Sequence, residues 1–175
     1  MAERAEGLSA FYGGTTWAAH RDAANATMID SDDVLLLRPA WEGSGVTVQR
    51  ERPKGGAPDE ARGLVDVTLF TLRDPPTPDL LQAAMHAGRI LRDGGALDAA
   101  WYVTEPSPNN FPRLPIREGV QVLVGVALFP GRHHFEKFAR GGRWQAEAAP
   151  LLRPHLAAEP RTMLLEPTTR SALRA

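Results

Sequence analysis

The stretch GLVDVTLFTLRDPPTPDLLQAAMHAGRILRDGG (residues 63–95) joins an expected strand to an expected helix. Its first ten residues are rich in β-branched and aromatic side chains, as strands are. Thr77 can then cap a helix that has Pro78 and Asp79 in its first turn and ends at Gly94. Within this helix one broad face is expected to face the core, and it carries Leu80, Leu81, Ala84, Met85, Gly88 and Leu91. The stretch therefore predicts a strand followed by an amphipathic helix.

The chain after this stretch predicts two more strands, a helix and a last strand. ALDAAWYVT (residues 96–104) and VQVLVGVALF (residues 120–129) are the two strands, with a proline-rich loop between them. A broken helix is expected over residues 131–156, and TMLLEP (residues 162–167) reads as the final strand. The order βαββαβ predicts an α+β, ferredoxin-like fold, in which helices cover one face of an antiparallel sheet. The other sheet face then needs a cover, because a bare apolar sheet invites aggregation.

One short pattern occurs twice in the chain, as FYGGTTW (residues 11–17) and FARGGRW (residues 138–144). The proline that ends the following strand comes 22 residues after the first Trp (17 to 39) and 23 after the second (144 to 167). Both copies are therefore interpreted as the second helix and fourth strand of one repeated unit. The predicted organisation is a partial repeat over residues 1–39, a Gly- and Pro-rich linker over residues 40–62, and a complete domain over residues 63–175.

A lone helix and strand bury too little apolar surface to offset their ordering entropy. Residues 1–39 are therefore expected to dock on the complete domain or on another chain. As an alternative, Met1 is an internal methionine of a longer reading frame, and the sequence does not separate the two. The uncovered sheet face and the partial repeat together predict a homo-oligomer, a dimer or larger.

Charge and composition exclude several classes of partner. The 20 Lys and Arg residues nearly balance 21 Asp and Glu, so no overall basic field would attract nucleic acid. The longest apolar run has eight residues (122–129), where a membrane helix needs about 20, so no membrane insertion is expected. The chain has no cysteine, and its first ten residues lack the apolar core of a secretory signal. A cytoplasmic location is the resulting expectation.

The chain also resembles a known family. Residues 10–40 (AFYGGTTWAAHRDAANATMIDSDDVLLLRPA) look like the end of one NIPSNAP domain. Residues 63–174, with AWYVTEPSPNNFPRLPIREG (residues 100–119) and FARGGRWQAEAAPLLRPHL (residues 138–156), look like a whole second one. The resemblance implies the dimeric α/β-barrel form of the ferredoxin-like fold, in which two units pair sheet to sheet around a cavity. The family is associated with vesicle transport and mitochondrial quality control in animals, and it offers no catalytic motif to transfer to this chain.

Strand alternation predicts which residues share a face of the sheet. The residues expected under the helices are Val65, Val67, Leu69, Val120, Val122, Val124 and Val126. The opposite face is expected to line a cavity, with Thr68, Phe70, Tyr102, Thr104, Gln121 and Phe129 as candidates beside Leu64, Asp66 and Leu123. Such an apolar surface with a few polar groups fits a small-molecule pocket and also an ordinary interface between sheets.

Two functions follow from this cavity. The first is a non-catalytic, NIPSNAP-like protein that assembles through its sheet faces and has room for a small-molecule ligand. The alternative is a cofactor-independent enzyme of the oxygenase or isomerase type that uses the cavity. Asp66 is then the candidate base, because desolvation in an apolar cavity raises the pKa of a carboxyl toward a useful value. No cofactor is expected in either case.

A metal site is the weakest of the chemical options. His133 and Glu136 are three residues apart on an expected helix, a spacing that fits two ligands. No third ligand is near them in sequence, and His20, His86 and His155 fall on other expected helices. The preferred interpretation is a polar, exposed start of a helix without a metal.

Overall fold

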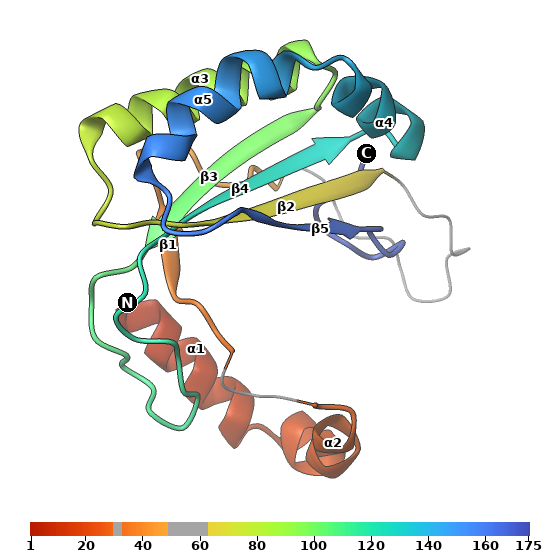
Figure 1. Cartoon of the computed structure of the whole chain (residues 1–175). Coiled ribbons are helices and arrows are strands. Elements are labelled where there is room, and N and C mark those ends of the chain that lie inside the picture. Colours follow the sequence, from red (N-terminus) through yellow and green to blue (C-terminus); the bar gives the residue numbers. More distant parts are fainter. Residues whose placement is uncertain (30–32, 49–62) are drawn as a thin grey trace. The chain divides into compact units, whose positions relative to one another are not determined.

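The computed structural model of the protein describes residues 1–29, 33–48 and 63–175. These residues form two compact units, shown in Figure 1. Unit 1 comprises Met1–Leu36 and Glu105–Gly119, and unit 2 comprises Leu37–Thr104 and Val120–Ala175. Within the described ranges, every helix is too short or too polar to cross a bilayer.

Unit 2 is built on a five-stranded antiparallel sheet with the order β1-β3-β4-β2-β5. Its strands are β1 (Leu37–Pro39), β2 (Leu64–Thr71), β3 (Asp98–Thr104), β4 (Val122–Phe129) and β5 (Arg161–Leu165). Its helices are α3 (Pro78–Asp93), α4 (Arg132–Arg140), the π-helical turn η1 (Trp144–Ala148), α5 (Ala149–Leu152) and the short 3₁₀ turn η2 (Arg153–His155). The order from β2 to β5 is the predicted βαββαβ, and the four strands β3-β4-β2-β5 have the ferredoxin-like arrangement. The predicted α+β, ferredoxin-like fold is confirmed.

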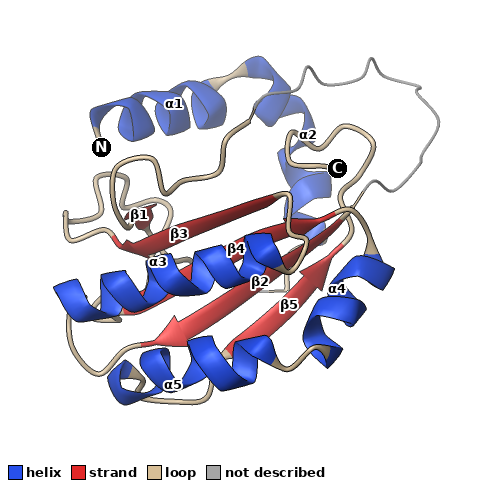
Figure 2. Ribbon diagram, turned by 90° about the horizontal axis from the view of Figure 1, so that it is seen from above, coloured by secondary structure: helices blue, strands red, loops and turns tan. Residues whose placement is uncertain are grey.

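The helices of unit 2 lie on one face of this sheet (Figure 2). Helix α3 begins where the sequence predicts, because the side-chain oxygen of Thr77 accepts the backbone N–H of Leu80 at 3.3 Å. One side of α3 is buried, from Leu80 to Leu91. Together with Trp101 and Phe129 of the sheet, that side forms the main hydrophobic core. The core therefore lies between α3 and the sheet, as the amphipathic pattern requires.

The predicted assignment of the two sheet faces is wrong. The helices cover the face that carries Phe70, Trp101, Leu123, Ala127 and Phe129, all of which belong to the core. The valine-rich face lies on the other side of the sheet. The physical reason is buried area: the large aromatic side chains of this face bury more apolar surface against the helices than valines would.

The start of the predicted linker folds against the edge of the sheet. Strand β1 pairs with β3, and the chain continues along that edge so that Ala40 donates its backbone N–H to Trp101. Trp101 in turn donates its own N–H to the carbonyl of Ser44, whose hydroxyl donates to the carbonyl of Trp101 at 2.8 Å. Residues 49–62 of the predicted linker lie outside the described residues.

Unit 1 contains α1 (Ala2–Gly13) and α2 (Thr15–Ala26), neither of which has a buried residue. The ring of Tyr12 stacks on Phe111 with ring centroids 5.6 Å apart. Arg4 donates to the side-chain oxygens of Asn109 and Asn110, at 3.1 and 2.7 Å. The loop Glu105–Gly119 is thus held against α1 by a few polar and aromatic contacts.

Both copies of the repeated sequence pattern contain a helix break. Helix α1 ends at Gly13 before α2 begins, and α4 ends at Arg140 before η1 begins. In each copy the Phe and Trp that flank the break contact one another, with ring centroids 5.4 Å apart for Phe11 and Trp17 and 6.5 Å apart for Phe138 and Trp144. The similar sequences therefore have similar local structure. Their interpretation as a partial and a complete repeat stays a prediction.

Candidate functional site: a cavity between the sheet and its helices

A cavity of about 540 Å³ lies in unit 2 between the sheet and the helices that cover it. Its size suits a small molecule of two or three rings. Its polar floor is formed by Asp66 and Thr68 beside Gly125 and Ala127. Its aromatic lining comes from Phe70, Trp101, Phe135, Phe138 and Trp144. The arrangement combines aromatic and aliphatic walls with several polar and charged groups, which could orient a ligand.

The floor of the cavity is set by strand register. Thr68 of β2 lies directly opposite Gly125 of β4, and Gly125 lies opposite Trp101 of β3. Because Gly125 has no side chain, the ring of Trp101 lies directly against it: a Cβ on Gly125 would be 3.0 Å from Cζ3 of Trp101. Because these side chains of β4 are small or absent, the indole ring and the cavity occupy the space above the strand.

Trp101 is held on its other side by helix α3. A Cβ on Gly88 would lie 2.9 Å from the indole Nε1 of Trp101, so only glycine fits there without a shift. Trp101 as a whole is 1% exposed. Its Nε1 has no hydrogen-bond partner among the described residues, although buried tryptophan nitrogens usually have one. Trp101 is therefore a rigid wall of the cavity whose position depends on two glycines.

Asp66 is the ionisable group in the floor of the cavity. Its side chain is partly buried, and its Oδ1 accepts a hydrogen bond from the hydroxyl of Thr68 at 3.0 Å. Burial raises the pKa of Asp66 above the ordinary value, and the hydrogen bond from Thr68 opposes that rise in part. An acid in such surroundings holds its proton to a higher pH than an exposed one. When it is protonated, Asp66 can donate a hydrogen bond as well as accept one.

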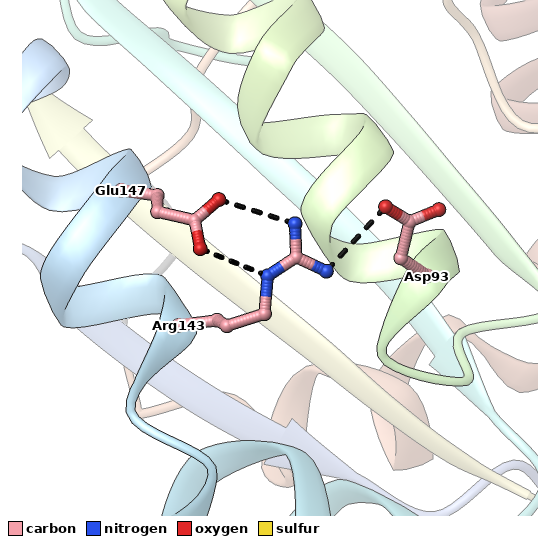
Figure 3. Close-up of polar contacts among 3 residues, drawn as sticks. All are labelled: Asp93, Arg143 and Glu147. Atoms are coloured by element: carbon pink, nitrogen blue, oxygen red, sulfur yellow. Dashed lines mark hydrogen bonds and ion pairs between the residues drawn. The ribbon is translucent and has the colours of Figure 1, made fainter.

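The helical side of the cavity includes the π-helical turn η1, a rare conformation that is often found at functional sites. Arg143, just before η1, donates to both carboxylate oxygens of Glu147, at 3.0 and 3.1 Å, and contacts Asp93 at 3.5 Å (Figure 3). These contacts tie the turn to the end of α3. The adjacent residues Trp144 and Gln145 line the cavity.

The structure brings some of the predicted site residues together and separates others. Asp66, Thr68 and Phe70 line the cavity. Phe129 instead fills the core, where its ring contacts those of Phe135 and Phe138.

The other three predicted cavity residues have structural roles outside this cavity. The hydroxyl oxygen of Tyr102 accepts the backbone N–H of Val46 at 2.8 Å. The hydroxyl of Thr104 bridges to the backbone of Val120 and Val122. The backbone carbonyl of Gln121 accepts the N–H of Leu72. The cavity therefore lies under the helices and not on the opposite face, where the sequence interpretation placed it.

The sequence did not predict the other aromatic residues of the cavity or its small residues, which are Trp101, Phe135, Phe138, Trp144, Gly125 and Ala127. Gly125, within the apolar run of residues 122–129, was the available signal, because an interior strand glycine marks a close approach of another group. The metal candidates His133 and Glu136 are both exposed on α4. In the described part of the chain, no three His, Asp or Glu side chains are grouped to hold a metal ion.

A second, more open groove lies on the outer surface of unit 2. It runs along α3 and the segment that contains α5 and η2. Its lining includes Met85, His86, Leu151 and His155. It has no buried polar group and no aromatic enclosure, so it fits the features of a ligand site less well than the cavity does.

Comparisons with known proteins found structural similarity at low sequence identity. No family model and no curated protein sequence matches the chain. SnoaB, a cofactor-independent oxygenase from Streptomyces nogalater, has a TM-score of 0.44 and 13% identity over 60% of this chain and 92% of its own.

Two other solved structures are similar to the same degree. A dimeric ferredoxin-like protein of unknown function from Thermobifida fusca YX has a TM-score of 0.42 and 17% identity, covering 67% of this chain and 99% of its own. An anthrone oxidase-like protein has a TM-score of 0.43 and 14% identity, covering 97% of this chain and 71% of its own. The ferredoxin-like assignment itself follows from the strand order of unit 2.

Proposed function

We propose that this protein binds a planar, mostly apolar small molecule in the cavity of unit 2, with a hydroxyl or carbonyl group of the ligand at Asp66. The observation that carries the proposal is the partly buried carboxyl of Asp66, held by Thr68 in the floor of an aromatic enclosure. Aromatic side chains favour flat apolar ligands through stacking and edge contacts. Asp66 and Thr68 are among the polar groups of the cavity that would fix the orientation of the ligand.

The surroundings of Asp66 support a functional role. Among the described residues it forms no ion pair, so burial of its charge is not offset by a cation. A carboxyl whose ionised form destabilises the fold is expected where it serves a ligand or a reaction. An uncharged side chain at this position would give a more stable protein. A functional role for Asp66 explains why the chain has a carboxyl there despite the lower stability.

The proposal for the whole chain is a NIPSNAP-like protein. Residues 1–39 would be the second half of one repeat, residues 40–62 a linker and residues 63–175 a complete unit. Support comes from the two similar helix breaks and from the strand that follows each of them, β1 and β5.

We further propose that the chain associates with itself through its sheet. Met163 and Leu165 of β5 are each 50% exposed, and β5 is the outermost strand on its side of the described sheet. An exposed apolar strand at a sheet edge favours association. This assembly and the ligand cavity are compatible, because the cavity is on the helical side of the sheet.

The ligand proposal is tested by titrating the protein with 2-naphthol, a flat aromatic compound with one hydroxyl, and following tryptophan fluorescence. Saturable quenching is expected, because Trp101 and Trp144 line the cavity. Asp66→Asn should weaken binding about tenfold, which corresponds to one hydrogen bond of about 1.4 kcal/mol. Asp74→Asn removes the same charge from an exposed turn and should bind like the wild type. Equal affinity in all three proteins would contradict a role for Asp66.

A second candidate function is catalysis by proton abstraction, and the raised pKa of Asp66 favours it. The carboxylate would take a proton from a carbon beside a carbonyl, and the electron pair of the C–H bond would pass into the enolate. The enolate is an intermediate from which a reaction of the isomerase type or of the oxygenase type can proceed. The probe is 2-tetralone in D₂O, with deuterium incorporation beside its carbonyl followed by NMR. Asp66→Asn should slow the catalysed exchange about 100-fold, and exchange at the uncatalysed rate in the wild type would rule this candidate out.

A further inference from the structure

We propose that Thr68 and Thr162 form a hydroxyl pair that positions the Asp66 carboxyl and carries protons between it and the solvent at strand β5. The inference rests on the proposed role of Asp66 in the cavity. It adds a residue from the edge strand, Thr162, which the sequence interpretation did not single out.

The three side chains form a continuous hydrogen-bonded chain. The hydroxyl of Thr68 is 3.0 Å from Oδ1 of Asp66 and 3.0 Å from the hydroxyl of Thr162. Thr68 and Thr162 are directly opposite in the β2–β5 register, so their side chains share the helical face of the sheet. Thr162 lines the cavity and is exposed. The chain therefore runs from the floor of the cavity to its outer rim.

The directions of these hydrogen bonds follow from the number of protons. A threonine hydroxyl has one proton to donate and two lone pairs. When Asp66 is ionised, Thr68 donates to it, so Thr162 has to donate to Thr68. When Asp66 is protonated, both hydrogen bonds can reverse direction, so that Asp66 donates to Thr68 and Thr68 donates to Thr162. The pair thus satisfies both states of the carboxyl without any movement of the strands.

A proton can leave Asp66 along this chain with every atom accounted for. The carboxyl passes its proton to the hydroxyl of Thr68, which passes its own proton to Thr162, which passes its own to a water molecule. Each threonine then has one hydroxyl proton, as before, and the water molecule becomes hydronium. The reverse sequence reprotonates the carboxyl. A ligand that fills the cavity excludes water from the floor, and the edge strand then supplies the remaining route.

The other charged groups of the cavity lie outside this chain. They are Arg73, after β2, Arg153, in η2, and Glu159, before β5. The lining residues of α3, α4 and η1 carry no charge. None of the described hydrogen bonds or ion pairs joins Asp66 to these three groups. Thr68 is therefore the side chain expected to control the ionisation of Asp66 most closely.

The test is a pH titration of the Asp66 carboxyl by ¹³C NMR in the ligand-free protein. Thr68→Val should raise the pKa of Asp66 further, because it removes the hydrogen bond that favours the ionised form. Thr162→Val should raise it by a smaller amount, since Thr68 loses the donor that orients it. Thr162→Ser keeps the hydroxyl and should titrate like the wild type. Thr71→Val is the matched control on the other face of β2, and it should leave the titration unchanged.

A purely structural Thr68–Thr162 contact would alter stability without altering this titration. If Thr162→Val titrates like the wild type, the pair does not position Asp66 and the inference is overturned. This readout uses no ligand, so it is independent of whether the proposed function is correct.

The proton route has its own readout in the 2-tetralone exchange, because deuterium enters the probe only after the abstracted proton has left for the solvent. Thr162→Val should slow incorporation severalfold, and Thr162→Ser should retain it. Incorporation that depends on Asp66 but is unaffected by Thr162→Val would overturn the route. Incorporation that does not depend on Asp66 would overturn the catalytic proposal instead, while the titration still decides the positioning role.

Discussion

The indole ring of Trp101 packs against Gly125, and a Cβ at that glycine would lie 3.0 Å from Cζ3 of the ring. This contact joins two central strands and sets one wall of the cavity. The ring is confined on its other side by Gly88 of α3, where a Cβ would lie 2.9 Å from the indole nitrogen. The two glycines therefore confine the ring at two of its edges and set the position of this wall of the cavity.

Substitution of either glycine should therefore destabilise the protein. Gly125→Ala and Gly88→Ala are each expected to lower the free energy of unfolding by about 1–3 kcal/mol, the usual cost of overpacking a core. Urea denaturation followed by circular dichroism measures this change. Gly7→Ala is the control for a helical glycine, because a Cβ there meets nothing within 4 Å, and it should be neutral or slightly stabilising. A similar loss in all three variants would show that the contact with Trp101 is not the cause.

The pKa of Asp66 predicts how stability depends on pH. Burial raises this pKa above its ordinary value of 3.8, so the folded chain binds the proton more tightly than the unfolded chain. Ionisation of Asp66 therefore lowers stability as the pH rises from 3.8 through the folded pKa. Asp66→Asn should be more stable than the wild type at neutral pH, with the difference lost below pH 3.8. A difference that grows toward acid pH would contradict the assigned direction.

The ion pairs of Arg143 are expected to contribute little to stability. Arg143, Glu147 and Asp93 are all on the surface, where solvent and salt screen their attraction. Arg143→Ala should lower the melting temperature only slightly, and the difference from the wild type should shrink in molar salt. Differential scanning calorimetry at low and high salt measures both effects. A large loss that persists in high salt would mean that the arginine has a packing role in holding η1.

Self-association through β5 predicts a particle larger than the 19.0 kDa chain. Light scattering at micromolar concentration should give a mass above this value. Leu165→Asp should shift the mass toward the monomer, because it places a charge on the exposed apolar strand. Leu97→Asp changes a leucine that is 57% exposed outside β5, and it should have no effect. A wild-type protein that is monomeric under these conditions would contradict the assembly proposal.

The element order was predictable because each signal is local. Thr77, Pro78 and Gly94 define the limits of α3 through capping and backbone geometry, and the glycine pairs place the two helix breaks. The register of strands could not be predicted in this way. It depends on which residues meet across the sheet, such as Thr68 and Thr162, which are 94 positions apart in sequence.

The choice of sheet face was not predictable from apolar content. Both faces of β2 and β4 contain apolar residues, so alternation groups the residues without saying which group the helices cover. The decision depends on tertiary packing, such as the close approach of Trp101 to Gly125 and to Gly88 of α3, which alternation does not reveal. The residue type of Asp66 and its place in the strand predict a carboxyl in a cavity. The contact between Thr68 and Thr162 could not be predicted, because it depends on the pairing of β2 with β5.

The proposal that ligands bind in the cavity floored by Asp66 and Thr68 can be tested by a protein-observed NMR screen. The screen uses a panel of planar aromatic fragments that carry a hydroxyl or carbonyl group. We expect hits that perturb the signals of Thr68, Phe70 and Trp101 and that bind more weakly to Asp66→Asn. Fragments that leave these signals unchanged, or that bind instead in the outer groove around His86 and His155, would contradict it.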